Sequence, residues 1–392
     1  VELTRDGSAR AAVTLRAEGE ARTRDFVLRY AIGGDRPQAA LLAHREAEDG
    51  YFSLLVQPPA APADAEIVPR DVTFVVDTSS SMNGRPLEHA RATIRRVVEG
   101  LRPTDRFNVI GFADQVRAMS EASVARDATA VARAEAFLDE LRATGATQMV
   151  PAIERALAAP TAGDRLSIVV LVTDGYIGNE AAVLRAIAPR LGDRRLYALG
   201  VEAAPNHFLI ERAAEIGRGQ AIVAALTDDP ADAATRFASY IDRPVFTDVA
   251  IDWGGLEVRD VYPRRVPDLF ADRPLVVDGR FTGGGAATVR VRGSVGGRRY
   301  ERAIEVALPT APTPEGPHAS QATLWARAAV HERMNRLALR DDDALIEEVR
   351  QLGLAHHLVT PWTSFVAVEQ RVEPTPEGEG EAEAEARPTV SP

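Results

Sequence analysis

The sequence contains no lysine and no cysteine. All 46 basic residues are therefore arginines, which excludes a P-loop lysine, a Schiff-base lysine and a Ser-Lys dyad. Without cysteine the chain forms no disulfide, no thiolate nucleophile and no zinc site built on sulfur. Several enzyme classes are thus ruled out before any motif is considered.

The chain also lacks an excess of positive charge and long apolar runs. Its formal net charge is −11, which argues against nucleic-acid binding. No apolar run is long enough to span a membrane, and no signal-peptide pattern opens the sequence. The 392 residues suffice for two or three domains with cores of their own. Because the first residue is Val1 rather than Met, we expect the chain to be a piece of a longer protein.

The hydrophobic pattern between residues 67 and 243 alternates between strands and helices. Apolar segments predict buried strands at 72–76, 107–112, 166–172 and 196–201. The intervening segments carry apolar residues at helical spacing. Strands that are buried on both faces and separated by amphipathic helices indicate an α/β fold with a doubly wound, mostly parallel sheet.

The regions on either side of this unit alternate in strand fashion. We interpret residues 1–66 as the C-terminal part of a β domain, because so few strands with an open edge do not make a whole domain. Residues 244–310 predict a small antiparallel sandwich, and we expect the N-terminal strands to pair with it or with a C-terminal strand. Residues 311–370 predict two helices and a strand near 365–368, and residues 371–392 predict an acidic disordered tail.

The most informative segment is Asp-Val-Thr-Phe-Val-Val-Asp-Thr-Ser-Ser-Ser-Met, residues 71–82. Its apolar strand ends in Asp77, Ser79 and Ser81, so one carboxylate and two hydroxyls stand at alternate positions past the carboxyl end of a strand. Ligands bind at this edge of open α/β sheets. All three oxygens are hard donors that suit Mg²⁺ or Mn²⁺ rather than zinc or copper. Turn and helix-cap chemistry is the alternative explanation for such a cluster.

Two further oxygen donors fall where other strands of the same sheet end. Thr147 lies in Thr-Gly-Ala-Thr-Gln before a predicted helix, and Asp174 lies in Leu-Val-Thr-Asp-Gly just past an apolar strand. The whole set supplies at most five direct ligands, so an octahedral ion keeps at least one position for water or an outside oxygen. An open position of this kind suits capture of an acidic side chain from a partner.

These three motifs resemble the metal-ion-dependent adhesion site of von Willebrand factor type A domains, and the resemblance spans residues 68–243. It implies Mg²⁺ as the usual ion, with Mn²⁺ or Ca²⁺ as alternatives. It also implies five metal ligands: Asp77, Ser79, Ser81, Thr147 and Asp174. One residue departs from the family pattern, because Ser80 stands where glycine is usual. We expect the loop to tolerate this serine with reduced backbone freedom.

The flanking segments narrow the resemblance. Residues 24–28 and 51–59 are similar to the end of a vault/inter-alpha-trypsin (VIT) domain. The motifs Asp-Trp-Gly-Gly-Leu, Leu-Trp-Ala-Arg and Thr-Pro-Trp-Thr-Ser-Phe resemble segments on the C-terminal side of the type A domain in such proteins. The chain therefore resembles an inter-alpha-trypsin inhibitor heavy-chain-like protein of the bacterial group described as marine proteobacterial sortase targets. That resemblance implies a cell-surface or extracellular location and a protein or matrix ligand that offers a carboxylate.

Three functions remain open. The first is a non-enzymatic adhesion or protein-binding module that depends on a divalent cation. The second is a structural stalk whose metal only stiffens a loop. The third is a Mg²⁺-dependent phosphohydrolase with Asp77 as nucleophile. The sequence disfavours this enzyme, because Ser79 stands where a second acid is needed and neither a lysine nor a general base is available.

Overall fold

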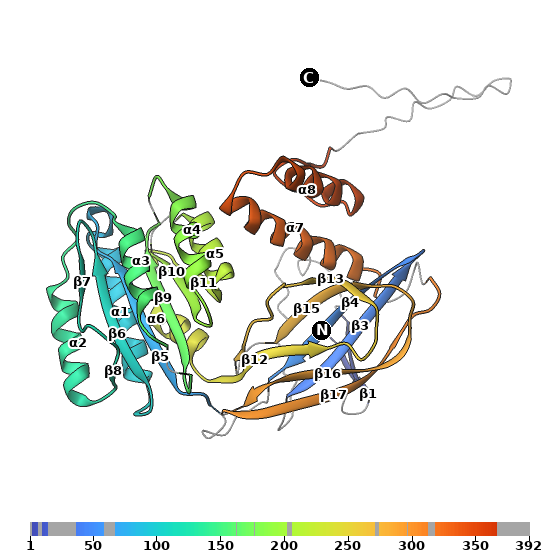
Figure 1. The fold of residues 1–392 in the computed structure, drawn as a ribbon, viewed down its shortest axis with the longest axis horizontal. Coiled ribbons are helices and arrows are strands. Elements are labelled where there is room, and N and C mark those ends of the chain that lie inside the picture. The colour runs from blue at the N-terminus through green and yellow to red at the C-terminus, as the bar shows by residue number, and fades with distance from the viewer. Residues whose placement is uncertain are drawn as a thin grey trace.

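The computed structural model describes residues 2–6, 10–14, 37–58, 67–161, 163–175, 177–201, 206–270, 274–295, 297–312 and 318–366. These residues form an α/β unit, a β-sandwich of two sheets and two C-terminal helices (Figure 1). A separate hairpin consists of β1 (Glu2–Asp6) and β2 (Arg10–Thr14). The predicted acidic tail, residues 371–392, lies outside the described residues. In the described part of the chain, no helix is both long and apolar enough to cross a membrane.

The sheet of the α/β unit has the strand order β11-β10-β9-β5-β6-β7, with β8 paired to β6. The strands from β11 to β6 are parallel, whereas β7 and β8 run antiparallel to β6. The bounds are β5 (Arg70–Asp77), β6 (Arg106–Phe112), β7 (Val116–Ala118), β8 (Val124–Ala125), β9 (Leu166–Thr173), β10 (Arg195–Val201) and β11 (Arg218–Ala224). The predicted doubly wound, mostly parallel sheet is confirmed. The sequence pattern did not reveal the three edge strands, because β7 and β8 are short and β11 is only partly buried.

Helices cover both faces of this sheet, and alternate residues of each central strand enter different layers. Phe74 and Val76 pack against α1, α2 and α6, whereas Val75 packs against α3, α4 and α5. The helix bounds are α1 (Arg85–Gly100), α2 (Ala128–Glu140), α3 (Met149–Ala158), α4 (Glu180–Arg190), α5 (His207–Ile216) and α6 (Pro230–Ile241). Burial of apolar residues on both faces explains why the central strands read as continuous apolar runs.

The β-sandwich is built from two distant segments of the chain. One sheet has the order β14-β12-β16-β17 and the other the order β13-β15-β4-β3. The strands are β3 (Gln38–Glu46), β4 (Asp49–Gln57), β12 (Pro244–Asp252), β13 (Val258–Tyr262), β14 (Leu269–Phe270), β15 (Leu275–Phe281), β16 (Gly285–Val295) and β17 (Arg298–Leu308). Of the two pairing partners expected for the N-terminal strands, the structure shows the sandwich, since β4 runs antiparallel to β15. Residues 38–57 and 244–308 therefore form one sandwich rather than two separate β regions.

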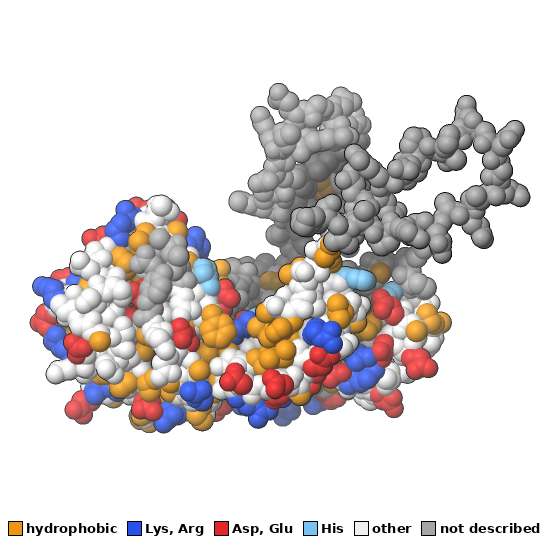
Figure 2. Space-filling view, turned by 90° about the horizontal axis from the view of Figure 1, so that it is seen from above, with side chains coloured by type: hydrophobic (Ala, Val, Ile, Leu, Met, Phe, Trp, Pro, Cys, Tyr) orange, Lys and Arg blue, Asp and Glu red, His pale blue; other side chains and the backbone are white. Residues whose placement is uncertain are grey.

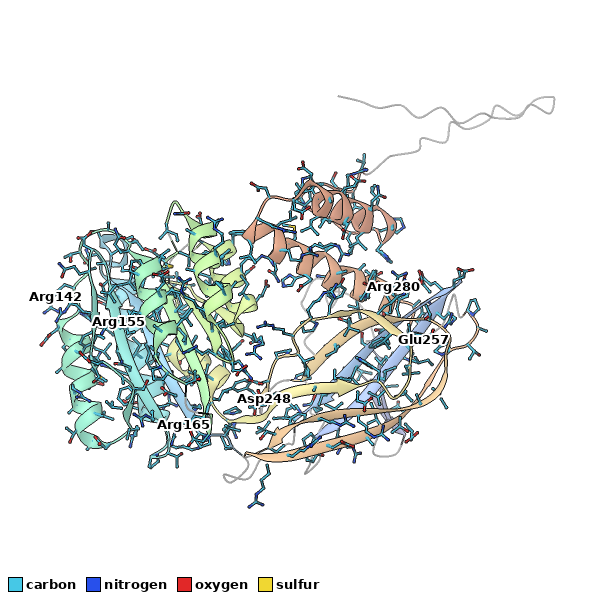
Figure 3. All side chains as sticks on the ribbon, in the orientation of Figure 1. Arg142, Arg155, Arg165, Asp248, Glu257 and Arg280 are labelled. Atoms are coloured by element: carbon cyan, nitrogen blue, oxygen red, sulfur yellow. The ribbon has the colours of Figure 1, made fainter. Side chains whose placement is uncertain are left out.

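A buried arginine joins the α/β unit to the sandwich. Arg195, at the start of β10, binds the Asp268 carboxylate through Nε at 2.5 Å and Nη2 at 2.7 Å. The same guanidinium lies 3.3 Å from Asp248 of β12, which Figure 3 places between the two parts. Burial alone would lower the pKa of Arg195, but its hydrogen bonds and ion pairs with Asp268 raise it above the ordinary value. The guanidinium therefore stays charged and holds the two parts together.

The C-terminal helix α7 (Gln321–Leu339) contacts both the sandwich and the α/β unit. Near its start, Trp325 packs on the rings of Tyr51 and Tyr262, with centroid distances of 5.4 and 6.4 Å. Near its end, Ala338 and Leu339 join the apolar layer of α3, α4 and α5. The helix α8 (Asp343–Ala355) packs back on α7. The two helices predicted from the sequence are thus confirmed.

The predicted strand near residues 365–368 is wrong for the residues that the structure describes. Phe365 and Val366 form no strand, and residues 367 and 368 lie outside the described part. The chain turns tightly just before, where Thr360 and Thr363 form an isolated bridge. Phe365 is 69% exposed and Val366 82% exposed, so these apolar residues do not pack on a sheet.

Candidate functional site

The candidate site lies at the carboxyl ends of β5 and β9, which are neighbours in the sheet. Asp77 is the last residue of β5 and is fully buried. Its Oδ1 accepts a hydrogen bond from the Ser79 backbone N–H at 2.9 Å, which curls the chain into a tight turn. The turn brings the hydroxyls of Ser79 and Ser81 within 3.1 Å of each other. The first motif therefore gathers its carboxylate and its two hydroxyls at one place.

The residue that departs from the family pattern fits its position. Ser80 begins the 3-10 turn η3 (Ser80–Met82) and does not have a positive φ. Its backbone N–H and its hydroxyl both donate to the carbonyl of Gly145 at 3.1 Å. The loop thus makes no demand for glycine at this point, and the serine gains a hydrogen bond to the neighbouring loop.

The loop that carries Thr147 is attached to the β5 turn through its main chain. The Thr144 N–H donates to the Thr78 carbonyl at 2.8 Å, next to the contact between Gly145 and the 3-10 turn. The Ala146 N–H donates to the carboxylate of Asp114 at 2.9 Å, at the end of β6. Thr147 itself is half-buried and lies one residue before Gln148, the N-cap of α3. These bonds hold the loop of Thr147 beside the β5 turn.

The end of β9 supplies the second carboxylate. Asp174 is fully buried and follows Thr173, whose hydroxyl donates to Asp77 Oδ2 at 2.7 Å. The same hydroxyl accepts the Gly175 N–H at 2.9 Å, so one threonine joins the ends of the two strands. The Asp174 carbonyl accepts the Asn206 N–H at 3.0 Å, which attaches this loop to the start of α5. Hydrogen bonds therefore connect the ends of β5 and β9, the loop before α3 and the start of α5 at this edge of the sheet.

The electrostatics of Asp77 fit a cation. Burial raises the pKa of Asp77 above its ordinary value, hydrogen bonds from Ser79 and Thr173 oppose the rise, and the negative charge of Asp174 adds to it. Among the described residues, no arginine forms an ion pair with the Asp77 carboxylate. A buried carboxylate beside a second one costs free energy unless a positive charge offsets it. Carboxylates and hydroxyls are also hard oxygen donors, so the residues present fit Mg²⁺ or a similar ion.

The donor set differs from a site made only of acids and histidines. In the part of the chain that the structure describes, no group of three or more His, Cys, Asp and Glu side chains is placed to hold a metal ion. The candidate site has two carboxylates, and its remaining oxygens belong to Ser79, Ser81 and Thr147. Metal binding by this mixed set is therefore a proposal.

The sequence motifs did not identify three residues that position the candidate ligands. Thr173 bridges the ends of β5 and β9. The sequence feature that could have identified it is a hydroxyl at the last position of an otherwise apolar strand. Asp114 fixes the Thr147 loop, and its signal was an acid just past the strand 107–112. Gly145 has φ +78°, and a Cβ at this residue would collide with the Asp114 carboxylate.

The chain resembles known proteins at the level of this domain and beyond. Residues 70–223 match the family model of the von Willebrand factor type A domain. Inter-alpha-trypsin inhibitor heavy chain H2 of Sus scrofa is 22% identical over 346 residues, which cover 81% of this chain and 36% of that protein. Heavy chain H4 of Homo sapiens is 26% identical over 346 residues, which cover 82% of this chain and 37% of that protein. The chain spans little more than a third of the length of these relatives.

Solved structures share the fold. A von Willebrand factor type A protein from Catenulispora acidiphila superposes with a TM-score of 0.57 at 17% identity, covering 84% of this chain and 89% of that one. The ArnB paralog VWA2 from Sulfolobus acidocaldarius gives a TM-score of 0.52 at 16% identity, covering 82% and 91%. The resemblance to type A domains and to the inhibitor heavy chains that the motifs predicted is confirmed at this level.

Proposed function

We propose, from the premise that residues 70–223 form a von Willebrand factor type A domain, that this chain is a non-enzymatic binding module. Domains of this family are often protein-binding or adhesion modules. In our proposal, binding depends on a divalent cation at the ends of β5 and β9, and the cation captures an acidic group of a partner protein. The observation that carries the proposal is the pair of buried aspartates, Asp77 and Asp174, beside an array of hydroxyls.

The proposed ligands differ in burial and in the role that we assign to them. The buried carboxylates of Asp77 and Asp174 supply the negative charge that holds the ion, which is Mg²⁺ or, as alternatives, Mn²⁺ or Ca²⁺. Ser81 is exposed and Thr147 half-buried, whereas Ser79 is buried. When bound, the ion supplies a positive centre with a coordination position open to a carboxylate from outside.

We propose that an arginine in a hollow beside the site assists the binding of an acidic partner. A hollow of about 330 Å³ is lined by Thr78 and Thr144, which flank the candidate ligands, and by four charged residues: Asp114, Arg117, Glu140 and Arg142. Arg117 is already paired with Glu140 at 3.2 Å, whereas the Arg142 guanidinium donates to the Leu141 carbonyl at 2.8 Å. In our proposal, Arg142 offers the acidic partner a second positive group.

Two features support binding rather than phosphoryl transfer. The residue two positions after Asp77 is Ser79, whose hydroxyl bonds to Ser81 and whose N–H bonds to Asp77. It cannot serve as a general acid in the way that a second aspartate does. The chain also has no lysine to stabilise a transferred phosphoryl group.

We place the activity outside the cell, at a cell surface or in a secreted protein. Support comes from the similarity to inter-alpha-trypsin inhibitor heavy chains over about 80% of this chain. Basic and acidic side chains are interspersed on the face seen in Figure 2, without a basic patch that would suit nucleic acid.

The first experiment measures metal binding. Mg²⁺ is titrated into metal-free protein by calorimetry, and the wild type is compared with Asp77→Asn. The matched control is Asp164→Asn, which removes an exposed carboxylate before the start of β9, at the opposite end of that strand from Asp174. We expect binding in the wild type and the control and none in Asp77→Asn. Equal heats in all three proteins would refute the site.

The second experiment separates capture of a partner from a structural metal. Mn²⁺ replaces Mg²⁺, and the proton relaxation of the probe peptide Gly-Glu-Gly is compared with that of Gly-Gln-Gly, both N-acetylated and C-amidated so that the glutamate side chain is the one carboxylate that differs. We expect enhanced relaxation of the glutamate side chain alone, and only with protein whose Asp77 is intact. If Mn²⁺ binds but both peptides relax equally, the metal is structural and the stalk function replaces our proposal.

A further inference from the structure

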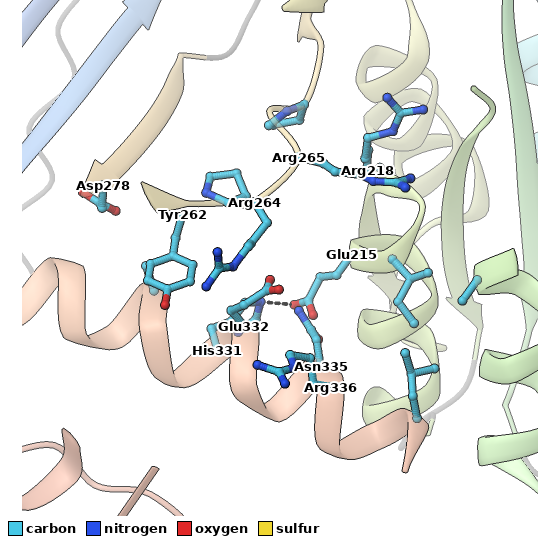
Figure 4. A pocket seen from close by; sticks show the side chains of 17 residues that line it. Glu215, Arg218, Tyr262, Arg264, Arg265, Asp278, His331, Glu332, Asn335 and Arg336 are labelled. Atoms are coloured by element: carbon cyan, nitrogen blue, oxygen red, sulfur yellow. Dashed lines mark ion pairs between the residues drawn. The ribbon is translucent and has the colours of Figure 1, made fainter. Parts of the chain in front are cut away.

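A cleft of about 500 Å³ lies where the α/β unit, the sandwich and α7 meet (Figure 4). Its first wall is the end of α5 with the start of β11, its second is the segment 262–267 after β13, and its third is the face of α7 between residues 328 and 339. None of its lining residues belongs to the candidate metal site. Clefts of this volume hold small molecules in proteins.

The cleft collects arginines from three elements of the fold. They are Arg218 of β11, Arg264 and Arg265 of the segment after β13, and Arg336 of α7. In the described part of the chain, no carboxylate forms an ion pair with any of the four. The grouping concentrates positive charge in one cleft of a chain whose formal net charge is −11.

The contacts that these arginines do make leave their charges unneutralised. Arg218 donates to the backbone carbonyls of Gly192 and Arg194 at 3.3 and 3.4 Å. The guanidinium of Arg264 lies 5.3 Å from the centroid of the Tyr262 ring. A cation over an aromatic face gains attraction but keeps its full charge. Both guanidinium groups therefore remain able to bind an anion.

Arg218 and Arg265 form the clearest anion site. Figure 4 shows their side chains close together at one rim of the cleft. Burial lowers the pKa of Arg218, and the positive charges of Arg195 and Arg265 lower it further, whereas the negative charges of Asp268 and Asp193 oppose the fall. Two guanidinium groups that repel each other are stabilised when an oxyanion lies between them, because each offers a planar fork of donors to it.

The acidic residues of the cleft are largely engaged elsewhere. Glu215 binds His331 at 2.5 Å and Arg212 at 2.8 Å, so its charge is already compensated. Asp278 accepts a hydrogen bond from Ser53, and burial raises the pKa of its carboxyl above the ordinary value. Glu332 is the remaining acid of the lining. The cleft thus has an excess of positive charge.

Apolar side chains provide the rest of the surface. Ile216 and Leu339 come from α5 and α7, and Pro263 and Pro267 come from the segment between them. We propose that this cleft binds a small organic oxyanion, with its phosphate or carboxylate group between Arg218 and Arg265 and its apolar body against the prolines and aliphatic side chains. Organic phosphates and aromatic dicarboxylates share this chemistry.

Such a ligand contacts all three parts of the fold at once. A molecule that binds only when α5, the segment 262–267 and α7 are in place stabilises that arrangement by mass action. The cleft would therefore couple the concentration of a small anion to the relative placement of the α/β unit, the sandwich and α7.

Binding is tested on the full chain with three probes in EDTA at constant ionic strength, so that the proposed metal site takes no part. Calorimetry and thermal shift are recorded with phenyl phosphate, with phthalate and with inorganic phosphate. We expect one of the two organic probes to bind and to raise the melting temperature more than inorganic phosphate does, because only they carry an apolar body. No binding by either organic probe at millimolar concentration would overturn the proposal.

Charge-reversal variants locate the binding. Arg265→Glu and Arg336→Glu change exposed residues of the cleft, and Arg299→Glu changes an exposed arginine of β17 as the matched control. We expect Arg265→Glu to weaken binding of the better probe on the order of tenfold or more, and Arg336→Glu to weaken it by a smaller factor. Equal weakening by Arg299→Glu would show that general charge attraction, rather than the cleft, binds the probe.

Discussion

The junction between the α/β unit and the sandwich depends on one buried ion pair, and Asp268→Asn tests it. The side chains of Arg195 and Asp268 are each only 2% exposed. Two nitrogens of the guanidinium bind the two carboxylate oxygens, and the Asp248 N–H donates to the same carboxylate at 3.0 Å. Asparagine keeps the shape of the side chain but loses its charge, so the substitution leaves a buried guanidinium without its main counterion.

The expected loss of stability follows from this burial. Removing one partner of a buried ion pair costs about 3–5 kcal/mol, and the lower end applies because the amide oxygen still accepts a hydrogen bond. For a domain of this size, about 3 kcal/mol corresponds to a fall in melting temperature of about 6–12 °C. Asp248 remains 3.3 Å from Arg195 but is 73% exposed, so it compensates little.

Differential scanning calorimetry measures the change, with Glu140→Gln as the matched control. That variant removes the carboxylate of the exposed pair between Arg117 and Glu140, whose side chains are 59% and 65% exposed. We expect no measurable shift in the control, because exposed pairs contribute little. If Asp268→Asn shifts the melting temperature no more than Glu140→Gln does, Arg195 does not hold the junction and the reasoning fails.

Four further predictions concern the candidate site and its supporting helices. Asp77→Asn should raise the melting temperature of the protein in EDTA. The reason is that the raised pKa of this carboxyl means that its ionised form destabilises the fold at neutral pH. A lower melting temperature of Asp77→Asn would contradict this prediction. Thr173→Val should lower the melting temperature by several degrees, since it leaves two buried polar partners unpaired at about 1–3 kcal/mol each. Gly145→Ala should weaken Mg²⁺ binding measured by calorimetry, because a Cβ displaces the carboxylate that fixes the Thr147 loop, whereas unchanged affinity would show that this loop contributes no ligand. Burial holds the pKa of His89 below its ordinary 6.5, so the unfolded chain binds the proton more readily and stability should fall as the pH drops below about 6.5; His89→Leu should flatten that part of a denaturation profile.

The sequence was sufficient for the α/β unit because its signals are local. The strand 72–76 is a continuous apolar run, and a run of that length bounded by helical stripes has few other interpretations. The two aspartates at strand ends followed from the same pattern, since parallel strands end at one edge of the sheet. Asp77 and Asp174 could therefore be named as candidates without coordinates.

The remaining features depend on contacts between distant residues, which no local pattern carries. Thr144 and Gly145 are attached to the β5 turn by main-chain hydrogen bonds, which almost any residue can form and which the sequence therefore does not reveal. The alternating apolar residues of β4 predicted a strand but not that its partner is β15. The same holds for the arginine cleft, whose members come from β11, the segment after β13 and α7.

The pairing of β4 with β15 has a consequence for how the chain is made. Ser53 and Asp278, which face each other in this pair, are 225 residues apart in the sequence. During synthesis, β3 and β4 emerge from the ribosome long before the strand that completes their sheet, whereas the α/β unit can finish folding as soon as its own last helix is translated. Until β15 is made, β4 has one edge without a partner strand. A nascent chain that stalls before residue 275 would therefore expose an aggregation-prone strand.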